Sequence, residues 1–384
     1  MSDATSAARP IVFVAGGTGG HIAPCLALAE AYEQRLGGPP PCWFICSDRG
    51  VDRWMLDPAV ASGRIRGVAP APAKPLKRTP AGLARVVMNW GPSLRIGRGV
   101  ITGAGVSSRS EPPVVVTTGG FVAPPAAQAA RVERVPLVVI ALDATPGKAG
   151  RFLARRAAMC LDASPGAERS ARPGWETISP LVRRAALPSK TPPDARRALG
   201  LDPDRPTLLV TGGSQGARSV NAFVAAHLEA HAEEWRAGGW QSLHLSGPTE
   251  VDALRFLYRS AGVPARVVPY LDAMGDAWSA ADLHVGRAGA GTVSEAMASG
   301  TFSILMPYPY HEDAHQRENA QAAVDRDLGI IADDFVESGE NLARHGALLS
   351  ERLRAGVMQD HGRHPLPEGA VHGAASAIER ILGA

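Results

Sequence analysis

The sequence has few of the residues that build disulfide scaffolds, zinc sites or membrane spans. Its 384 residues include only four cysteines, without a C-x-x-C pair or a Cys/His zinc spacing, so we expect reduced, buried thiols in a cytosolic protein. Glycine, proline or a charged residue interrupts every apolar stretch well before the ~18 residues of a membrane span. The first ten residues contain no apolar run, and we therefore expect no signal peptide.

Acidic residues are missing from one long segment. The net charge of the chain is only +3, which gives no reason to expect a nucleic-acid partner, but no Asp or Glu lies between Pro58 and Ser110. The basic residues of segment 64–109 are Arg64, Arg66, Lys74, Lys77, Arg78, Arg85, Arg95, Arg98 and Arg109. Its apolar residues at helical spacing are Leu83, Val86, Val87, Trp90 and Leu94. Such a segment either lies on anionic lipid or forms a solvated basic face over an ordinary core stripe.

Short apolar, largely β-branched runs alternate with helical stretches along the chain, which predicts buried parallel strands in βαβ units. The expected strands are Ile11–Ala15, Val114–Thr117, Leu137–Ile140, Thr207–Thr211, Ala265–Val268 and Ser303–Pro307. The expected helices include Pro24–Leu36 and Ala217–Glu233.

The same strand–glycine loop–helix pattern opens each half of the chain. We therefore predict an α/β protein with two Rossmann-like, doubly wound domains that face each other across a cleft. The expected domains are 1–182 and 183–365, with a linker near Pro188–Pro193 and a C-terminal helix over about 366–384 that could pack back on the first domain. Ligands of such sheets lie at the carboxyl ends of the strands, so both glycine loops should point toward the cleft.

Each loop suits an anion. Gly16–His21 (GGTGGH) and Gly212–Gly216 (GGSQG) both follow a strand and precede a helix, where free N–H groups favour a negative ligand such as a diphosphate. Neither loop has the G-x-G-x-x-G spacing or a Walker lysine. A tight turn without a ligand remains the alternative for each loop.

Three short motifs point to other chemistries. The second loop also fits G-x-S-x-G, the nucleophile elbow of α/β-hydrolases, with Ser214 as nucleophile. His311–His315 (HEDAH) fits the H-E-x-x-H pattern of zinc peptidases, although Pro307 and Pro309 place His311 in a loop. Asp202-Pro203-Asp204 resembles a D-x-D metal motif but is better explained as a turn.

Four motifs in this order resemble the MurG family, GT-B glycosyltransferases that add N-acetylglucosamine to lipid I to make lipid II in peptidoglycan synthesis. The motifs are GGTGGHIAP at Gly16–Pro24, TGGFVAPP at Thr118–Pro125, GGSQGARSVN at Gly212–Asn221, and AGAGTVSEAMAS at Ala288–Ser299 followed by HEDAHQRENA at His311–Ala320. The resemblance covers roughly Ile11 to Ala332.

The resemblance implies UDP-N-acetylglucosamine as the donor substrate. Leu271 would hold the uracil through its backbone, and Glu295 would accept hydrogen bonds from the ribose hydroxyls. The diphosphate would contact Ser214, Gln215, the amide of Ala290, and Arg183. His315 and Gln316 would bind the sugar hydroxyls, and Thr18, Gly19 and Gly20 would close over the sugar diphosphate. Gly119 and Gly120 would face the pyrophosphate of the acceptor.

The reaction implied by the resemblance is inverting transfer without a metal or other cofactor. A base must take the proton of the acceptor hydroxyl, and the leaving diphosphate must be stabilised. His21 is the candidate base, because its ordinary pKa near ~6.5 suits proton transfer at neutral pH. The family is peripheral to the membrane, which implies a location at the cytoplasmic face and a lipid-linked acceptor.

The sequence departs from the family pattern mainly on the acceptor side. Ala141 stands where the family has a glutamate, and Asp143 stands where it has an asparagine. We expect Asp143 to take over a polar contact, with His21 as its partner. Because of these changes, a related transferase with the same donor and another acceptor remains an alternative, as does a non-catalytic sugar-nucleotide-binding protein.

Overall fold

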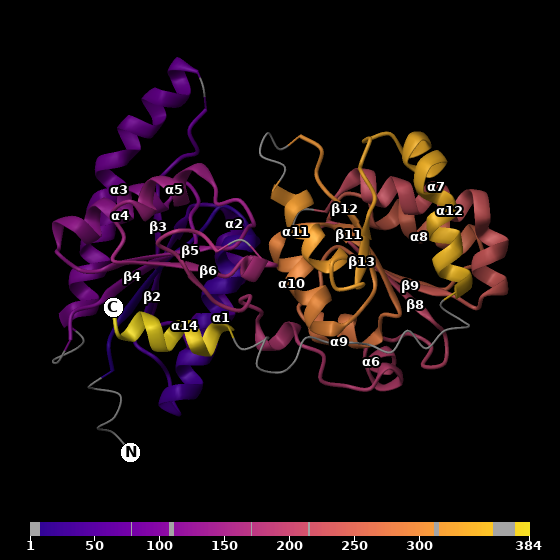
Figure 1. Cartoon of the computed structure of the whole chain (residues 1–384), viewed down its shortest axis with the longest axis horizontal. Coiled ribbons are helices and arrows are strands. Elements are labelled where there is room, and N and C mark those ends of the chain that lie inside the picture. Colours follow the sequence, from indigo (N-terminus) through magenta and orange to yellow (C-terminus); the bar gives the residue numbers. More distant parts are fainter. Residues whose placement is uncertain are drawn as a thin grey trace. The chain divides into compact units, whose positions relative to one another are not determined.

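The chain forms two compact units in a computed structural model that describes residues 8–77, 79–106, 111–169, 171–213, 216–310, 315–355 and 373–384. The first unit comprises Met1–Arg183 and His372–Ala384, and the second comprises Arg184–Val371 (Figure 1). The proline-rich segment near Pro188–Pro193, which we expected to be the linker, therefore belongs to the second unit.

The first unit is built on a seven-stranded parallel sheet of order β3-β2-β1-β4-β5-β6-β7. Its strands are β1 (Ile11–Val14), β2 (Cys42–Ser47), β3 (Gly67–Ala71), β4 (Val114–Thr117), β5 (Leu137–Ala141), β6 (Met159–Asp162) and β7 (Glu176–Thr177). Its helices are α1 (Gly19–Leu36), α2 (Gly50–Ala61), α3 (Pro80–Val106), α4 (Ala123–Val132), α5 (Lys148–Ala154), the 3-10 turn η1 (Ala167–Arg169) and α14 (Gly373–Leu382). The strand order reverses between β1 and β4, which makes this pair the switch point of the sheet.

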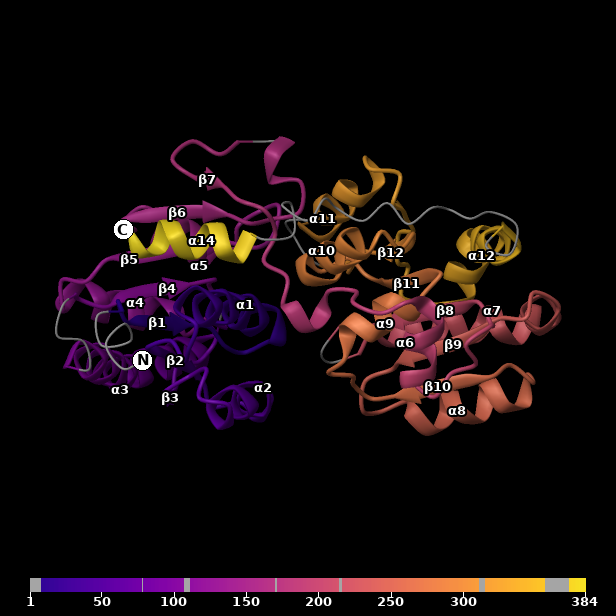
Figure 2. The ribbon, with the colours of Figure 1, turned by 90° about the horizontal axis from the view of Figure 1, so that it is seen from below.

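The core of this unit explains its local structure. β-branched residues such as Val12, Val14 and Val115 are fully buried on the strands, where their stiff side chains pack well. Small residues let α3 and α4 approach closely, since a Cβ on Gly97 would lie 3.0 Å from the Cβ of Ala129. The C-terminal helix α14 packs on α1, so the two ends of the chain are joined in one unit (Figure 2).

The second unit has a six-stranded parallel sheet of order β10-β9-β8-β11-β12-β13. Its strands are β8 (Thr207–Thr211), β9 (Gln241–Leu245), β10 (Ala265–Val268), β11 (Leu283–Arg287), β12 (Ser303–Met306) and β13 (Gly329–Ile331). Its helices are η2 (Arg184–Ala186), α6 (Pro192–Ala198), α7 (Arg218–Ala237), α8 (Val251–Ser260), α9 (Met274–Ala280), α10 (Ala290–Ser299), α11 (His315–Val324) and α12 (Ser338–Ala355). Here the order reverses between β8 and β11.

Helices cover both faces of this sheet. One hydrophobic core holds residues of α7, α8 and α12, whereas two others hold residues of α6, α9, α10 and α11. Figure 1 shows α10 and α11 on one side of the strands and α7, α8 and α12 on the other. The prediction of two doubly wound, Rossmann-like sheets is therefore confirmed.

Candidate active site

A cavity of about 810 Å³ lies in the second unit at the carboxyl ends of its strands. The glycine loop after β8 contributes Gly212, Gly213 and Gly216, and the loop after β11 contributes Gly289. Because β8 and β11 are neighbours and their helices leave on opposite faces, the cavity occupies the switch point of the sheet. Ligands of doubly wound folds bind at this position.

Two helix N-termini make the cavity attractive to anions. The first residue of the 20-residue helix α7, Arg218, lines the cavity, and so does Gly289, the residue that precedes α10. Neither of these two helix ends, as the structure describes them, receives a side-chain capping hydrogen bond. Their first N–H groups and their dipoles therefore favour a negatively charged ligand.

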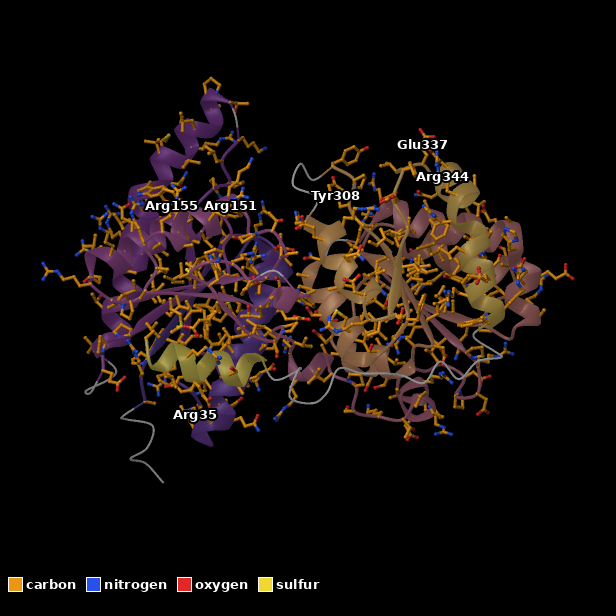
Figure 3. The ribbon with its side chains drawn as sticks, viewed as in Figure 1. Arg35, Arg151, Arg155, Tyr308, Glu337 and Arg344 are labelled. Atoms are coloured by element: carbon orange, nitrogen blue, oxygen red, sulfur yellow. The ribbon has the colours of Figure 1, made fainter. Side chains whose placement is uncertain are left out.

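The guanidinium of Arg287 lies in the cavity lining at the end of β11, paired with a carboxylate. Its Nη1 lies 2.6 Å from Asp334 Oδ2, and its Nη2 donates to Ser219 Oγ at 2.6 Å. The ring of Tyr308 lies over the guanidinium, 5.5 Å from ring centroid to Cζ. Figure 3 labels Tyr308 at the upper edge of the second unit. Because Asp334 is buried and pairs with it, Arg287 is held rigidly at the cavity wall.

The glycines of the second loop are required by close backbone contacts. A Cβ on Gly212 would lie 2.2 Å from the nitrogen of Ala217. Gly216 has a φ of +77°, and a Cβ there would lie 2.5 Å from the carbonyl oxygen of Ser246. A side chain at Gly212 or Gly216 would therefore collide with neighbouring backbone.

The structure brings some of the predicted donor residues to this cavity. Gln316 lines it, and its Oε1 accepts from the amide of Tyr308 at 2.9 Å. Ala290 is the first residue of α10, beside Gly289. His315 is the half-buried first residue of α11 and does not line the cavity. Ser214 and Gln215 lie outside the described residues.

Two predicted donor residues lie apart from the lining of the cavity. Leu271 is half-buried in the connection between β10 and α9, and Glu295 is half-buried on α10. Glu295 Oε2 accepts a hydrogen bond of 2.8 Å from the indole Nε1 of Trp278, a residue that the sequence analysis did not single out.

The two glycine loops of the first unit lie side by side because β1 pairs with β4. A Cβ on Gly120 would lie 3.2 Å from the carbonyl oxygen of Gly16 and 3.6 Å from His21 Cδ2. Gly119 and Gly120 have φ values of +103° and +81°, and the imidazole of His21 packs against both. The predicted base and the predicted acceptor loop are therefore in contact.

His21 lies in the first turn of α1, with its ring nitrogen Nδ1 buried and without a hydrogen-bond partner among the described residues. Burial lowers the pKa of His21, while the charge of Asp143, a hydrogen bond to Thr118 and the charge of Asp52 act to raise it. The net result is a neutral imidazole at pH 7, which can accept a proton.

Asp143 follows β5 and is half-buried. Arg172 stabilises this segment: it donates to the carbonyl oxygens of Asp143 and Ala144 and forms an ion pair of 2.6 Å with Asp162 at the end of β6. The charge of Asp143 acts to raise the pKa of His21. The catalytic partnership of the two residues stays a prediction.

The remaining predicted residues lie elsewhere in the first unit. Thr18 is the exposed residue that precedes α1, Gly19 begins the helix in a buried position, and Gly20 is exposed. Arg183 is the last residue of the first unit before the chain enters the second, and its Nε donates to Glu30 Oε1 at 3.2 Å on α1. A phosphate-binding role of Arg183 stays a prediction.

Sequence reasoning missed the side chains that hold the first loop. The buried carboxylate of Asp52 accepts from the amide of Gly17 at 2.9 Å and from the amide and hydroxyl of Ser47 at 2.9 and 2.6 Å. Arg49 Nη1 donates to the carbonyl oxygen of Gly17 at 2.7 Å. The amide of Gly17 is consequently occupied by Asp52. Nothing in the local sequence indicates this bond, because the partners lie 35 residues apart.

The alternative motifs can be placed in part. Asp202 Oδ1 accepts from the amide of Asp204 at 3.0 Å, which confirms the turn interpretation of that motif. Residues 311–314 of the peptidase-like motif lie outside the described part of the chain, as does Ser214 of the hydrolase-like motif.

Two doubly wound parallel sheets in one chain, with a cavity at the switch point of the second, are typical of the GT-B class. Within that class, the chain belongs to glycosyltransferase family 28. The N-terminal domain of this family matches residues 11–161, and its C-terminal domain matches residues 207–364.

Relatives and solved structures agree with this assignment. A protein of Verminephrobacter eiseniae, named UDP-N-acetylglucosamine–N-acetylmuramyl-(pentapeptide) pyrophosphoryl-undecaprenol N-acetylglucosamine transferase, is 36% identical over 91% of this chain and 94% of its own length. A protein of the same name from Halorhodospira halophila is 33% identical over 97% of this chain and 98% of its own length. The resemblance to the MurG family is thereby confirmed.

The structural comparison shows the fold. The crystal structure of Acinetobacter baumannii MurG has a TM-score of 0.63 at 22% identity and covers 97% of this chain and 99% of its own. A UDP-N-acetylglucosamine 2-epimerase has a TM-score of 0.61 at 12% identity, with 98% and 96% covered. The GT-B fold is therefore confirmed, but the fold alone does not distinguish transfer from epimerisation.

Proposed function

We propose that this chain is an inverting hexosyltransferase that moves N-acetylglucosamine from UDP-N-acetylglucosamine to lipid I, undecaprenyl-pyrophosphoryl-N-acetylmuramoyl-pentapeptide, and so forms lipid II for peptidoglycan synthesis. The observation that carries the proposal is the cavity of the second unit, which two helix N-termini border. Their free N–H groups favour a diphosphate there. The name shared by the relatives supports the identity of donor and acceptor.

The donor would bind with its diphosphate at the starts of α7 and α10. Glu295 would accept hydrogen bonds from the ribose, Leu271 would contact the uracil, and Gln316 would bind the sugar. Because the backbone amides at these two helix starts would stabilise the charge that develops on UDP, the reaction requires no metal.

Transfer itself needs one proton acceptor. The oxygen of the acceptor hydroxyl attacks the anomeric carbon, the bond between that carbon and the diphosphate oxygen breaks, and UDP leaves with the electron pair. His21 takes the hydroxyl proton, and the nearby charge of Asp143 stabilises the imidazolium that forms. Gly119 and Gly120 would face the pyrophosphate of the acceptor.

A second candidate keeps the donor and changes the acceptor. Ala141 provides no polar group where the family has a glutamate, and Asp143 replaces an asparagine beside His21. These substitutions favour an altered acceptor pocket, whereas the cavity of the second unit favours an unchanged donor.

Attachment at the cytoplasmic face of the membrane is part of the proposal. Among the described residues, no helix combines the length and apolar character needed to cross a bilayer. Leu94 packs on the core, but Leu83, Val87 and Met88 are 56%, 66% and 75% exposed in the first turns of α3, which extend beyond the rest of the unit (Figure 1). Exposed apolar residues within the basic segment 64–109 support a peripheral contact with anionic lipid.

The test uses the full chain with radiolabelled UDP-N-acetylglucosamine and a lipid I analogue in anionic vesicles. We expect a labelled lipid product, activity that persists in EDTA, and protein that sediments with anionic but not zwitterionic vesicles. Transfer only to other acceptors would support the second candidate. Failure of UDP to raise the melting temperature would contradict both candidates, and activity lost in EDTA but restored by Mg²⁺ or Zn²⁺ would contradict metal independence.

A further inference from the structure

The indole of Trp278 lies directly beneath the carboxylate of Glu295. Trp278 belongs to α9 and is fully buried, whereas Glu295 belongs to α10 and is half-buried. The distance from Trp278 Nε1 to Glu295 Oε2 is 2.8 Å. The indole N–H is the only polar group of the tryptophan side chain, and this bond satisfies it.

The position of the indole is itself fixed by packing. Trp278 belongs to the core cluster formed by α6, α9 and α10, and its ring meets the ring of His284 edge-on with centroids 4.9 Å apart. His284 is held in turn by Thr211 Oγ1 at 2.9 Å and Ser303 Oγ at 3.1 Å. The indole N–H of Trp278 therefore stays in one position and can bond the Glu295 carboxylate in only one orientation.

This arrangement restricts a side chain that is ordinarily flexible. A glutamate on a helix surface samples many rotamers and loses that freedom when it binds a ligand. A hydrogen bond from a rigid donor to one carboxylate oxygen removes much of that freedom before the ligand arrives. The carboxylate is then oriented in advance for a ligand that presents adjacent hydroxyl groups.

We propose that Trp278 is a positioning residue, which orients Glu295 to bind the vicinal ribose hydroxyls of the nucleotide donor. The inference rests on the proposed function, in which Glu295 binds the ribose. Trp278 does not touch the donor; it acts only through the carboxylate.

The test variant is Trp278→Phe, which keeps an aromatic ring in the core and removes the N–H group. We expect the KM for UDP-N-acetylglucosamine to rise about three- to tenfold, the range of one net hydrogen bond, while kcat stays within about twofold. The matched control is Trp240→Phe. Trp240 is 1% exposed in the same unit, and its Nε1 donates to the carbonyl oxygen of Leu353 at 2.8 Å. This control should leave KM unchanged.

A donor without ribose hydroxyls separates positioning from a general loss of structure. With the 2′,3′-dideoxy analogue of the donor, the penalty of Trp278→Phe should disappear, because the carboxylate has nothing to bind. An equal penalty on both donors, or an equal effect of Trp240→Phe, would overturn the inference. If the wild type does not distinguish the two donors, the ribose role of Glu295 fails, and with it this part of the proposed function.

A measurement on the wild type covers the case in which Trp278→Phe does not fold. The ¹⁵N-indole resonance of Trp278, identified by its shift in Glu295→Gln, should move on addition of UDP and not of 2′,3′-dideoxy-UDP. The resonance of Trp240 should respond to neither. A Trp278 resonance that ignores UDP while other resonances report binding would overturn the inference. If no resonance responds to UDP, the proposed function is refuted and the inference with it.

Discussion

Gly17 shows at the scale of one residue how the first loop is held. Its φ is +89°, and a Cβ would lie 2.4 Å from Phe121 Cε1, so only glycine fits. Asp52 accepts from its amide and Arg49 donates to its carbonyl oxygen. The ring of Phe121 also lies under the guanidinium of Arg49, at 5.3 Å. The side chains of Arg49 and Asp52, at the start of α2, thus hold the loop that precedes α1 and its residue His21.

Asp52→Ala should strongly destabilise the first unit. The change leaves the amides of Gly17 and Ser47 and the hydroxyl of Ser47 buried without this acceptor, at about 1–3 kcal/mol for each unsatisfied group. We expect the free energy of unfolding in urea to fall by about 3 kcal/mol or more. The matched control is Asp48→Ala, which removes an exposed ion pair with Lys74 and should cost at most about 1 kcal/mol. Equal, small losses would show that Asp52 does not hold the loop.

His21 and Asp143 should act together in the reaction. His21→Ala and Asp143→Ala should each lower kcat about tenfold or more, as expected for a positioned acid–base pair. The pKa of His21 is lowered by burial and partly raised again by Asp143, so Asp143→Asn, which removes only the charge, should move the acidic limb of the kcat profile to lower pH. If neither the pH profile nor kcat changes in the Asp143 variants, Asp143 has no role in the reaction.

The sequence indicates part of this site because parallel strands place their following loops at one edge. His21 and Gly120 could be expected to meet once β1 and β4 were adjacent. Asp52 and Trp278 could not be found in this way. Their partners Gly17 and Glu295 lie 35 and 17 residues away, and the contacts arise only from the packing of neighbouring helices and loops.

The C-terminal helix α14 shows at the scale of an element how the chain closes on itself. A Cβ on Gly373 would lie 1.9 Å from the carbonyl oxygen of Ser179, so the helix can begin there only with glycine. At its other end, Arg9 Nη1 donates to the carbonyl oxygens of Leu382 and Ala384 at 3.0 and 2.7 Å. The helix is therefore an integral part of the first unit.

Ile381→Ala should destabilise the first unit by about 2–5 kcal/mol, because it removes buried apolar volume from α14 and leaves a cavity. Ile381 is fully buried. The control on the same helix is Glu379→Ala. This substitution removes an ion pair of 3.6 Å with Arg35, labelled in Figure 3, and both side chains are more than half exposed. That variant should lose less than about 1 kcal/mol. The free energy of unfolding of both variants can be measured in urea. Similar, small losses would mean that α14 contributes little to the stability of the first unit.

The ends of an element can be predicted from the sequence where a run of buried apolar residues sets them. They cannot be predicted where backbone hydrogen bonds in a loop or cap set them. The fully buried strands Val114–Thr117 and Thr207–Thr211 have the predicted bounds. Ala265–Val268 also has the predicted bounds, but as the edge strand β10 it buries only Val267, so the expectation of a buried strand is wrong there. Helix α1 begins at Gly19 instead of Pro24, because the glycine loop itself makes the first turn and Pro24 is accommodated within the helix. Pro192 begins α6, where proline needs no N–H partner, and Thr191 provides the cap.

The dependence of stability on pH is a property of the whole molecule. Three fully buried histidines belong to the second unit. The pKa is lowered by burial to about 4 for His227 and to about 3 for His244 and His284. The two ring nitrogens of His244 pair with Tyr258 and Asn221, and His227 pairs with Trp235 and Ser350. Such networks hold the neutral ring and disfavour protonation.

The second unit should therefore lose stability as the pH falls. The unfolded chain binds protons at these histidines below their ordinary pKa of ~6.5, and the folded chain does not until pH 3–4. Stability is thus fully present above ~6.5 and declines below it, by roughly 2 kcal/mol per histidine at pH 5. Urea titrations between pH 7.5 and 5 should show this decline. His244→Asn removes one group that takes up a proton on unfolding, so the slope of the free energy of unfolding against pH should fall by about 1.4 kcal/mol per pH unit. An unchanged slope would mean that His244 becomes protonated in the folded state.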